Sequence, residues 1–155
     1  MTTIAYRDGI IAADLQSGNG NRGGTMHKIG RDETGSLIGG CGDAPMVYQL
    51  VRWFVEGRQK PMPPVYGKFG NDDCDVHAFI IDPDKRTYRV EPAGVFEIMA
   101  EYLAMGSGSA YALGAMAAGA DARKAVECAT LHDVHTGMGI ETLDLGVVGN
   151  PFPKF

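Results

Sequence analysis

The first residues of the chain are where its chemistry is concentrated. Thr2 directly follows Met1, and we expect Met1 to be removed because the next residue is small. Thr2 would then carry a free α-amine beside its own hydroxyl, and the pKa of an α-amine lies close enough to neutrality for much of it to accept a proton. A hydroxyl with such a built-in base is an activated nucleophile. Taken alone, the same segment also fits an ordinary chain start that leads into an edge strand.

The other reactive side chains do not form a second centre in the sequence. The chain has 3 cysteines without C-x-x-C spacing, which favours free thiols in a reducing cytosol: Cys41, Cys74 and Cys128. The histidines are scattered, and His132 and His135 have only Asp133 nearby as a further ligand. We therefore expect no metal site and no required cofactor, while a bound monovalent or divalent cation stays open.

Length and charge bound the class of protein. The 155 residues are expected to form one domain over residues 1–155, long enough to bury a core. With 14 basic and 19 acidic residues the net charge is −5, so we expect neither nucleic acid nor an anionic membrane as a partner. No apolar stretch is long enough to span a membrane and no export signal is apparent, which predicts a cytoplasmic protein.

Two predicted hairpins would position the first chemical groups. Residues 3–7 and 10–14 are largely apolar segments on either side of Asp8-Gly9, which is a strong hairpin signal. A second hairpin is predicted over residues 26–30 and 36–40. Between the two hairpins, residues 15–24 are rich in glycine and polar residues and are predicted to form a loop.

The rest of the chain alternates groups of strands with helices. Asp43 offers an N-cap and Pro45 lies in the first turn of an amphipathic helix predicted over residues 44–56. Residues 57–74, rich in proline and glycine, are predicted to form a surface loop. Further elements are predicted as strands at 76–81, 87–90, 95–105 and 140–148, helices at 109–118 and 122–132, and an irregular tail with Pro151 and Pro153. Because the strands come in hairpins, we expect an α+β fold of packed antiparallel sheets with helices outside.

Motifs in one order along nearly the whole chain resemble the proteasome β-subunit and HslV family, the Ntn-hydrolase threonine peptidases of family T1. They are Thr2-Thr3-Ile4, Ala12-Ala13-Asp14, His27-Lys28-Ile29, Gly39-Gly40-Cys41-Gly42-Asp43-Ala44, Gly106-Ser107-Gly108-Ser109-Ala110-Tyr111-Ala112 and Asp133-Val134-His135-Thr136-Gly137. The resemblance implies a four-layer α-β-β-α sandwich. Since residues 57–74 read as a loop where the family has a second helix, it implies a shortened form with one helix layer reduced.

The resemblance also implies catalytic roles. Thr2 would be the nucleophile with its own amine as base. Lys28 would lower the cost of forming the alkoxide, Asp14 would hold Lys28 by an ion pair, and Gly39 would offer its main-chain N–H to the oxyanion. From the residues alone, these could also be a solvated strand lysine, a turn-capping aspartate and a glycine in a bend.

A supporting set and a specificity pocket complete the implied site. Ser107, Asp133 and Thr136 would form hydrogen bonds near the amine of Thr2, with Thr136 in place of the family's serine. Helix capping is an alternative for Ser107. The side chains implied to shape an apolar substrate pocket are Met26, Leu37 and Cys41, for which core packing is the alternative.

The expected function is that of an N-terminal threonine endopeptidase that hydrolyses peptide bonds through an acyl-enzyme on Thr2. Alternatives are an Ntn amidohydrolase acting on a small amide and a non-catalytic assembly protein of the same fold. The resemblance implies a peptide or unfolded-protein substrate, a homo-oligomer as a ring or smaller, and service by an ATP-dependent unfoldase. The short form would suit a bacterium or a phage. Gln16-Ser17-Gly18 stands where many members carry a threonine that binds the substrate main chain.

Overall fold

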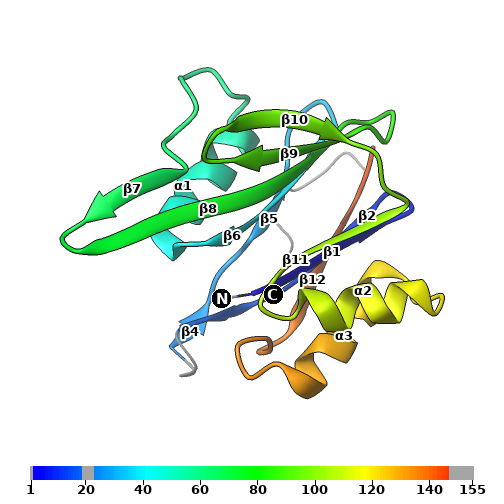
Figure 1. The fold of residues 1–155 in the computed structure, drawn as a ribbon. Helices are drawn as coiled ribbons and strands as arrows, with labels where there is room; N and C mark the ends of the chain where they lie inside the picture. The colour runs from blue at the N-terminus through cyan, green and yellow to red at the C-terminus, as the bar shows by residue number, and fades with distance from the viewer. Residues whose placement is uncertain (1, 19–22, 147–155) are drawn as a thin grey trace.

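Two antiparallel sheets face each other in the computed structural model, which describes residues 2–18 and 23–146. The smaller sheet has four strands in the order β11-β1-β2-β12. Its members are β1 (Thr3–Arg7), β2 (Ile10–Asp14), β11 (Tyr102–Gly106) and β12 (Ile140–Asp144). Figure 1 shows this sheet lying between the second sheet and the helix pair α2 and α3.

The second sheet has six strands and follows the order β10-β9-β8-β6-β5, with β7 paired to β8. Its members are β5 (Ile29–Arg31), β6 (Leu37–Gly42), β7 (Tyr66–Phe69), β8 (Asp72–Ile81), β9 (Thr87–Glu91) and β10 (Gly94–Ile98). A short separate pair joins β3 (Gln16–Ser17) to β4 (Gly24–Thr25). All pairings are antiparallel, as the hairpin pattern of the sequence predicts.

Helices cover the outer faces of both sheets in the described part of the chain. They are α1 (Ala44–Val55), α2 (Ser109–Ala117) and α3 (Ala122–His132). Asp43 caps α1 by accepting the amide of Met46 at 3.2 Å, and Asp121 caps α3 by accepting the amide of Lys124 at 2.8 Å. Each cap satisfies a main-chain donor that the first helical turn leaves free. The capped start of α1 is the one that the sequence predicts.

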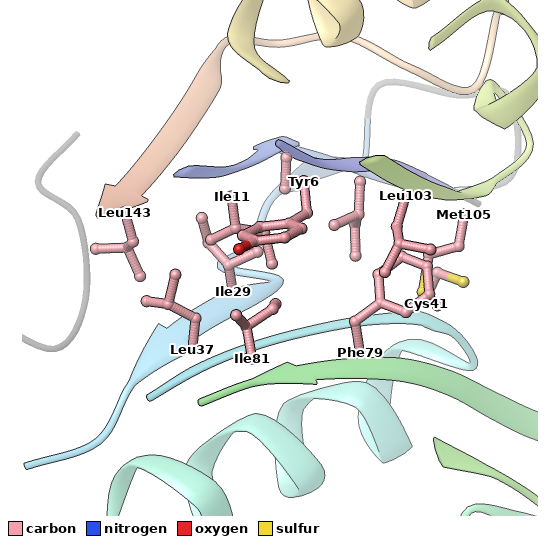
Figure 2. Close-up of a cluster of buried hydrophobic side chains, with 12 residues drawn as sticks. Tyr6, Ile11, Ile29, Leu37, Cys41, Phe79, Ile81, Leu103, Met105 and Leu143 are labelled. Carbon is pink, nitrogen blue, oxygen red and sulfur yellow. The ribbon is translucent and has the colours of Figure 1, made fainter. Parts of the chain in front are cut away.

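The core between the sheets fixes one sheet against the other. Figure 2 shows Tyr6, Ile11 and Leu103 meeting Phe79 and other apolar side chains of the facing sheet. Full burial of such a side chain contributes roughly 1.5–3 kcal/mol. Two further clusters pack α1 on the larger sheet, and α2 with α3 on the smaller one. The architecture is therefore α+β, with antiparallel sheets and outer helices in a layered arrangement.

The turn between β1 and β2 decides which residues meet at the far end of the hairpin. Asp8 and Gly9 have φ angles of 52° and 82°, the pair of positive values that a tight type I′ turn requires. The resulting register pairs Ile4 with Ala13. Thr3 and Asp14 therefore lie side by side, and the amide of Thr3 donates to the carboxylate of Asp14 at 2.9 Å.

Three stretches differ from the sequence predictions. Residues 57–74, predicted as a loop, contain β7 and the start of β8, which turn at Gly70. Both strands are exposed there, with Phe69 at 62%, so they lack the apolar alternation that reveals a strand. The predicted 15–24 loop contains β3 and the start of β4. The last strand ends at Asp144; residues 147–148 of the predicted strand, with Pro151 and Pro153, lie outside the described residues.

Candidate active site

Asp14, the last residue of β2, is the centre of the site and is fully buried. Its Oδ1 accepts the hydroxyl of Thr2 at 2.5 Å, the amide of Thr3 at 2.9 Å and the ammonium of Lys28 at 2.9 Å. Its Oδ2 accepts the amides of Gln16 at 3.2 Å and Gly137 at 3.0 Å. A carboxylate this deep is tolerated because it is paired and hydrogen-bonded on both oxygens. The cation expected for Asp14 is thus present.

Lys28 is held just before β5 begins and is 3% exposed. Burial lowers the pKa of Lys28, while the carboxylates of Asp14 and Glu141 work to raise it. The hydroxyl of Thr2 and the ammonium of Lys28 share one oxygen of Asp14. The structure thus brings Thr2, Asp14 and Lys28 together on one carboxylate oxygen.

The supporting residues predicted from the sequence also converge. Asp133 Oδ2 accepts the hydroxyls of Ser107 and Thr136, each at 2.6 Å. Partial burial works to raise the pKa of Asp133, but the hydrogen bonds from Ser107, Thr136 and the amide of His135 outweigh it and leave that pKa below its usual value. Ser107 lies 3.4 Å from the carbonyl oxygen of Thr2. The set therefore contacts the N-terminal segment directly.

Two glycines make room for this segment. A Cβ on Gly106, whose φ is +96°, would lie 1.9 Å from the carbonyl oxygen of Thr2. A Cβ on Gly108 would lie 2.0 Å from the hydroxyl of Thr3. That hydroxyl is in turn 2.7 Å from the hydroxyl of Thr136. The end of β11 and the start of α2 can approach β1 this closely only because both positions lack a side chain.

Thr2 lies on the walls of two cavities. The first, of about 310 Å³, is lined by Thr2, Gln16, Ser17, Gly18, Met26, Lys28, Cys41, Gly42, Asp43, Ala44, Pro45 and Val47. The second, of about 370 Å³, is lined by Thr2, Cys41, Gly42, Asp43, Asp73, Cys74, Asp75, Gly106 and Ser107. The first therefore combines apolar and polar groups, and the second carries carboxylates without a lysine or arginine in its lining. Both are open spaces beside Thr2, a residue that is itself only 2% exposed.

The predicted pocket residues divide into two groups. Met26 and Cys41 line the first cavity, and burial raises the pKa of the Cys41 thiol to about 11. Leu37 lies elsewhere, which corrects its predicted place. It is fully buried in the core between the sheets, where it pairs with Ile81 at the end of β6 remote from Cys41 (Figure 2).

The placement expected for Gly39 is likewise corrected. Gly39 lies inside β6, between its register partners Ile29 on β5 and Phe79 on β8, and lines neither cavity. A Cβ at Gly39 would lie 2.8 Å from Ile11 Cδ1 and 3.0 Å from Ile4 Cγ2. This glycine therefore allows the two sheets to approach. The glycine of the same motif that lines both cavities is Gly42.

Sequence reasoning missed one buried carboxylate. Glu141 on β12 is 4% exposed and accepts the amide of Lys28 at 2.9 Å. A signal was present, because the two-residue period of a strand places Glu141 on the same face as the buried Leu143. Pro45 and Val47 on the cavity wall carried no comparable signal.

Neither a metal cluster nor a membrane span is found in the described ranges. Within residues 2–18 and 23–146, no group of three or more His, Cys, Asp and Glu side chains could hold a metal ion. None of the helices described is long and apolar enough to cross a bilayer.

Comparison with known proteins shows similarity at the level of the fold. No family model and no curated protein matches the chain. Among solved structures, Thiobacillus denitrificans BPH in complex with epoxomicin matches with a TM-score of 0.63 at 22% identity, covering 94% of this chain and 99% of that one. Thiobacillus denitrificans BPH alone matches with a TM-score of 0.62 at 23% identity, covering 94% and 98%.

Proposed function

We propose that the chain is an N-terminal threonine peptidase of the proteasome β-subunit and HslV type. Its layered architecture would then be the four-layer Ntn-hydrolase sandwich in a shortened form, with α1 alone on one side. The observation that carries the proposal is the shared oxygen of Asp14, which binds both the hydroxyl of Thr2 and the ammonium of Lys28. Such a pairing at the residue that follows Met1 suits a nucleophile activated by its own amine.

The reaction would begin once Met1 has been removed. The Thr2 hydroxyl attacks a peptide carbonyl carbon, and the α-amine of Thr2 takes the hydroxyl proton. Lys28 stabilises the developing negative charge, and a main-chain N–H at the end of β6 would bind the oxyanion. The C–N bond then breaks, the leaving amine receives the proton, and an ester on Thr2 remains. Water hydrolyses this ester and restores the free hydroxyl.

Substrate binding would use the cavities beside Thr2. The first cavity combines Met26, Pro45 and Val47 with the polar residues Gln16 and Ser17, which suits an apolar side chain of an extended peptide. A peptide or unfolded protein is the proposed substrate class. Homo-oligomerisation and service by an ATP-dependent unfoldase remain predictions of the resemblance.

The similarity to Thiobacillus denitrificans BPH supplies a probe. That protein is known in complex with epoxomicin, so the same epoxyketone is a reasonable reagent for the present chain. Intact mass of the purified protein, measured before and after incubation with epoxomicin, tests the proposal. We expect loss of Met1 and one adduct, which peptide mapping should place on Thr2.

Variants at the nucleophile sharpen the test. Thr2→Ala should form no adduct, whereas Thr2→Ser keeps a hydroxyl and an amine and should still react. Retained Met1 without an adduct would refute the peptidase proposal for this protein and favour a non-catalytic assembly role. A Thr2 adduct without cleavage of any peptide, but with hydrolysis of small amides, would favour the amidohydrolase alternative.

A further inference from the structure

A second buried carboxylate, Glu141, lies next to the candidate site and binds the main-chain end of Lys28, whereas Asp14 binds its ammonium end. Glu141 belongs to β12 of the smaller sheet, and its Oε1 accepts the amide of Lys28 at 2.9 Å. Its Oε2 is 2.6 Å from Nδ1 of His27. One side chain therefore contacts two consecutive residues, His27 and Lys28, just before β5 begins.

This arrangement is energetically demanding. Burying a carboxylate costs several kcal/mol unless partners compensate for the lost water. Burial raises the pKa of Glu141, and the hydrogen bonds from His27 and from the amides of Lys28 and Ile29 oppose that rise without cancelling it. An apolar residue at this position could pack the two sheets together at a lower free-energy cost, so the charge of Glu141 needs a separate explanation.

The groups around Glu141 point to Lys28. On the β5 side stand His27 and Lys28, and on β2 the nearest charged group is Asp14, the register partner of Ile140. Ile140 packs toward α2 and α3, so Glu141, which alternates with it, faces the larger sheet. The Coulomb attraction of Glu141 is among the effects that raise the pKa of Lys28 against its burial.

On the premise of the peptidase function proposed above, we propose that Glu141 is a positioning residue for Lys28, which it holds at its main chain and keeps charged. Asp14 binds the ammonium end of Lys28 at 2.9 Å and Glu141 binds its main-chain end at 2.9 Å. Lys28 is thus held at both ends by carboxylates from the neighbouring strands β2 and β12. Without the contact to its main chain, the start of β5 could shift and carry the ammonium away from Thr2. His27, whose side chain is 26% exposed, connects Glu141 to the surface.

The test separates electrostatic support from a merely structural clamp. Glu141→Gln keeps an oxygen for the amide of Lys28 but removes the charge. With ¹³C-labelled lysine, the Cε signal of Lys28, assigned through Lys28→Arg, is titrated by NMR. In Glu141→Gln the midpoint of the Lys28 titration should lie roughly one pH unit lower than in the wild type. In the pH profile of epoxomicin adduct formation, the fall in rate on the alkaline side should begin at a correspondingly lower pH. Asp144→Asn, at an exposed carboxylate of the same strand, should leave both curves in place.

A second variant covers the case in which Glu141→Gln does not fold. His27→Ala keeps the Glu141 charge but removes a hydrogen bond that lowers the pKa of Glu141. That pKa should rise, so the acidic step that protonation of Glu141 produces in the Lys28 Cε titration should move to higher pH. An absent or unmoved acidic step in the Lys28 Cε titration of His27→Ala would overturn the proposal when Glu141→Gln cannot be measured.

The outcomes also separate this proposal from the proposed function. A wild-type protein that forms no adduct, with a Lys28 titration that still shifts in Glu141→Gln, would refute the peptidase and leave the link between Glu141 and Lys28 intact. A wild-type protein that reacts, with titration and pH profile unchanged in Glu141→Gln, would overturn the role of Glu141 alone.

Discussion

Replacing Asp14 by asparagine should destabilise the fold far more than the loss of one charge at a surface. Oδ1 of Asp14 accepts the hydroxyl of Thr2, one main-chain amide and the ammonium of Lys28, and Oδ2 accepts two further amides. An asparagine NH₂ group would face donors in either orientation. Lys28, at 3% exposure, would also keep a buried charge without its partner. Breaking a buried ion pair in this way costs about 3–5 kcal/mol.

Urea or thermal unfolding measures this loss. For a chain of this size, about 3–5 kcal/mol corresponds to a melting temperature lower by roughly 6–20 °C. Asp144→Asn, at an exposed position, is the control and should change stability by less than about 0.5 kcal/mol. The double variant Asp14→Asn with Lys28→Met keeps an amide oxygen as an acceptor and removes the unpaired ammonium, so it should recover about 2 kcal/mol relative to Asp14→Asn. A stability of Asp14→Asn within about 1 kcal/mol of the wild type would refute the reasoning.

Three further predictions concern the surroundings of the site. Gly106→Ala places a Cβ 1.9 Å from the carbonyl oxygen of Thr2 at a φ of +96°. Thermal unfolding should show a stability lower by about 1–3 kcal/mol, and adduct formation should be slower. The control Gly114→Ala, where a Cβ has no neighbour within 4 Å, should leave stability unchanged or raise it. The pKa of Asp133 is lower in the folded protein than in the unfolded chain. Its carboxylate therefore stabilises the fold fully above the unfolded-state pKa, and this stabilisation disappears as the pH falls through the folded-state pKa. In Asp133→Asn, the free energy of unfolding should fall less steeply towards acidic pH than in the wild type. An equally steep fall in both proteins would contradict this prediction. Because burial raises the pKa of Cys41 to about 11, its alkylation by iodoacetamide near neutral pH should be far slower in the native protein than in urea, as mass spectrometry would show; equal rates would exclude a buried thiol.

Local signals account for the elements that the sequence predicts well. Asp8-Gly9 fixes the first hairpin because few residues tolerate positive φ. Asp43 and Pro45 start α1 because a side-chain acceptor and a preset φ suit the first turn. The joining of Asp14 to Lys28 follows from the resemblance together with the need of a buried carboxylate for a cation.

The placements that the sequence did not predict correctly are those that depend on how the two sheets pack against each other. Leu37, Gly39 and Cys41 share one face of β6 by strand alternation, yet only Cys41 reaches the cavity. Where the core ends and the cavity begins is set by Ile4 and Ile11 from the other sheet, which local patterns do not encode. β7 escaped prediction because an exposed strand pair has no buried face to reveal it.

The burial of the chain start also sets an order of events in the cell. Thr2 and Thr3 are 2% and 0% exposed, and a peptidase that excises Met1 must grip the residue after it. On the peptidase proposal, Met1 would therefore have to be excised before β1 is enclosed by β2 and β11. Protein that folds before this excision would keep its methionine and would lack the free amine that the proposed reaction uses. For the same reason, a tag fused ahead of Thr2 is the wrong choice for producing this protein.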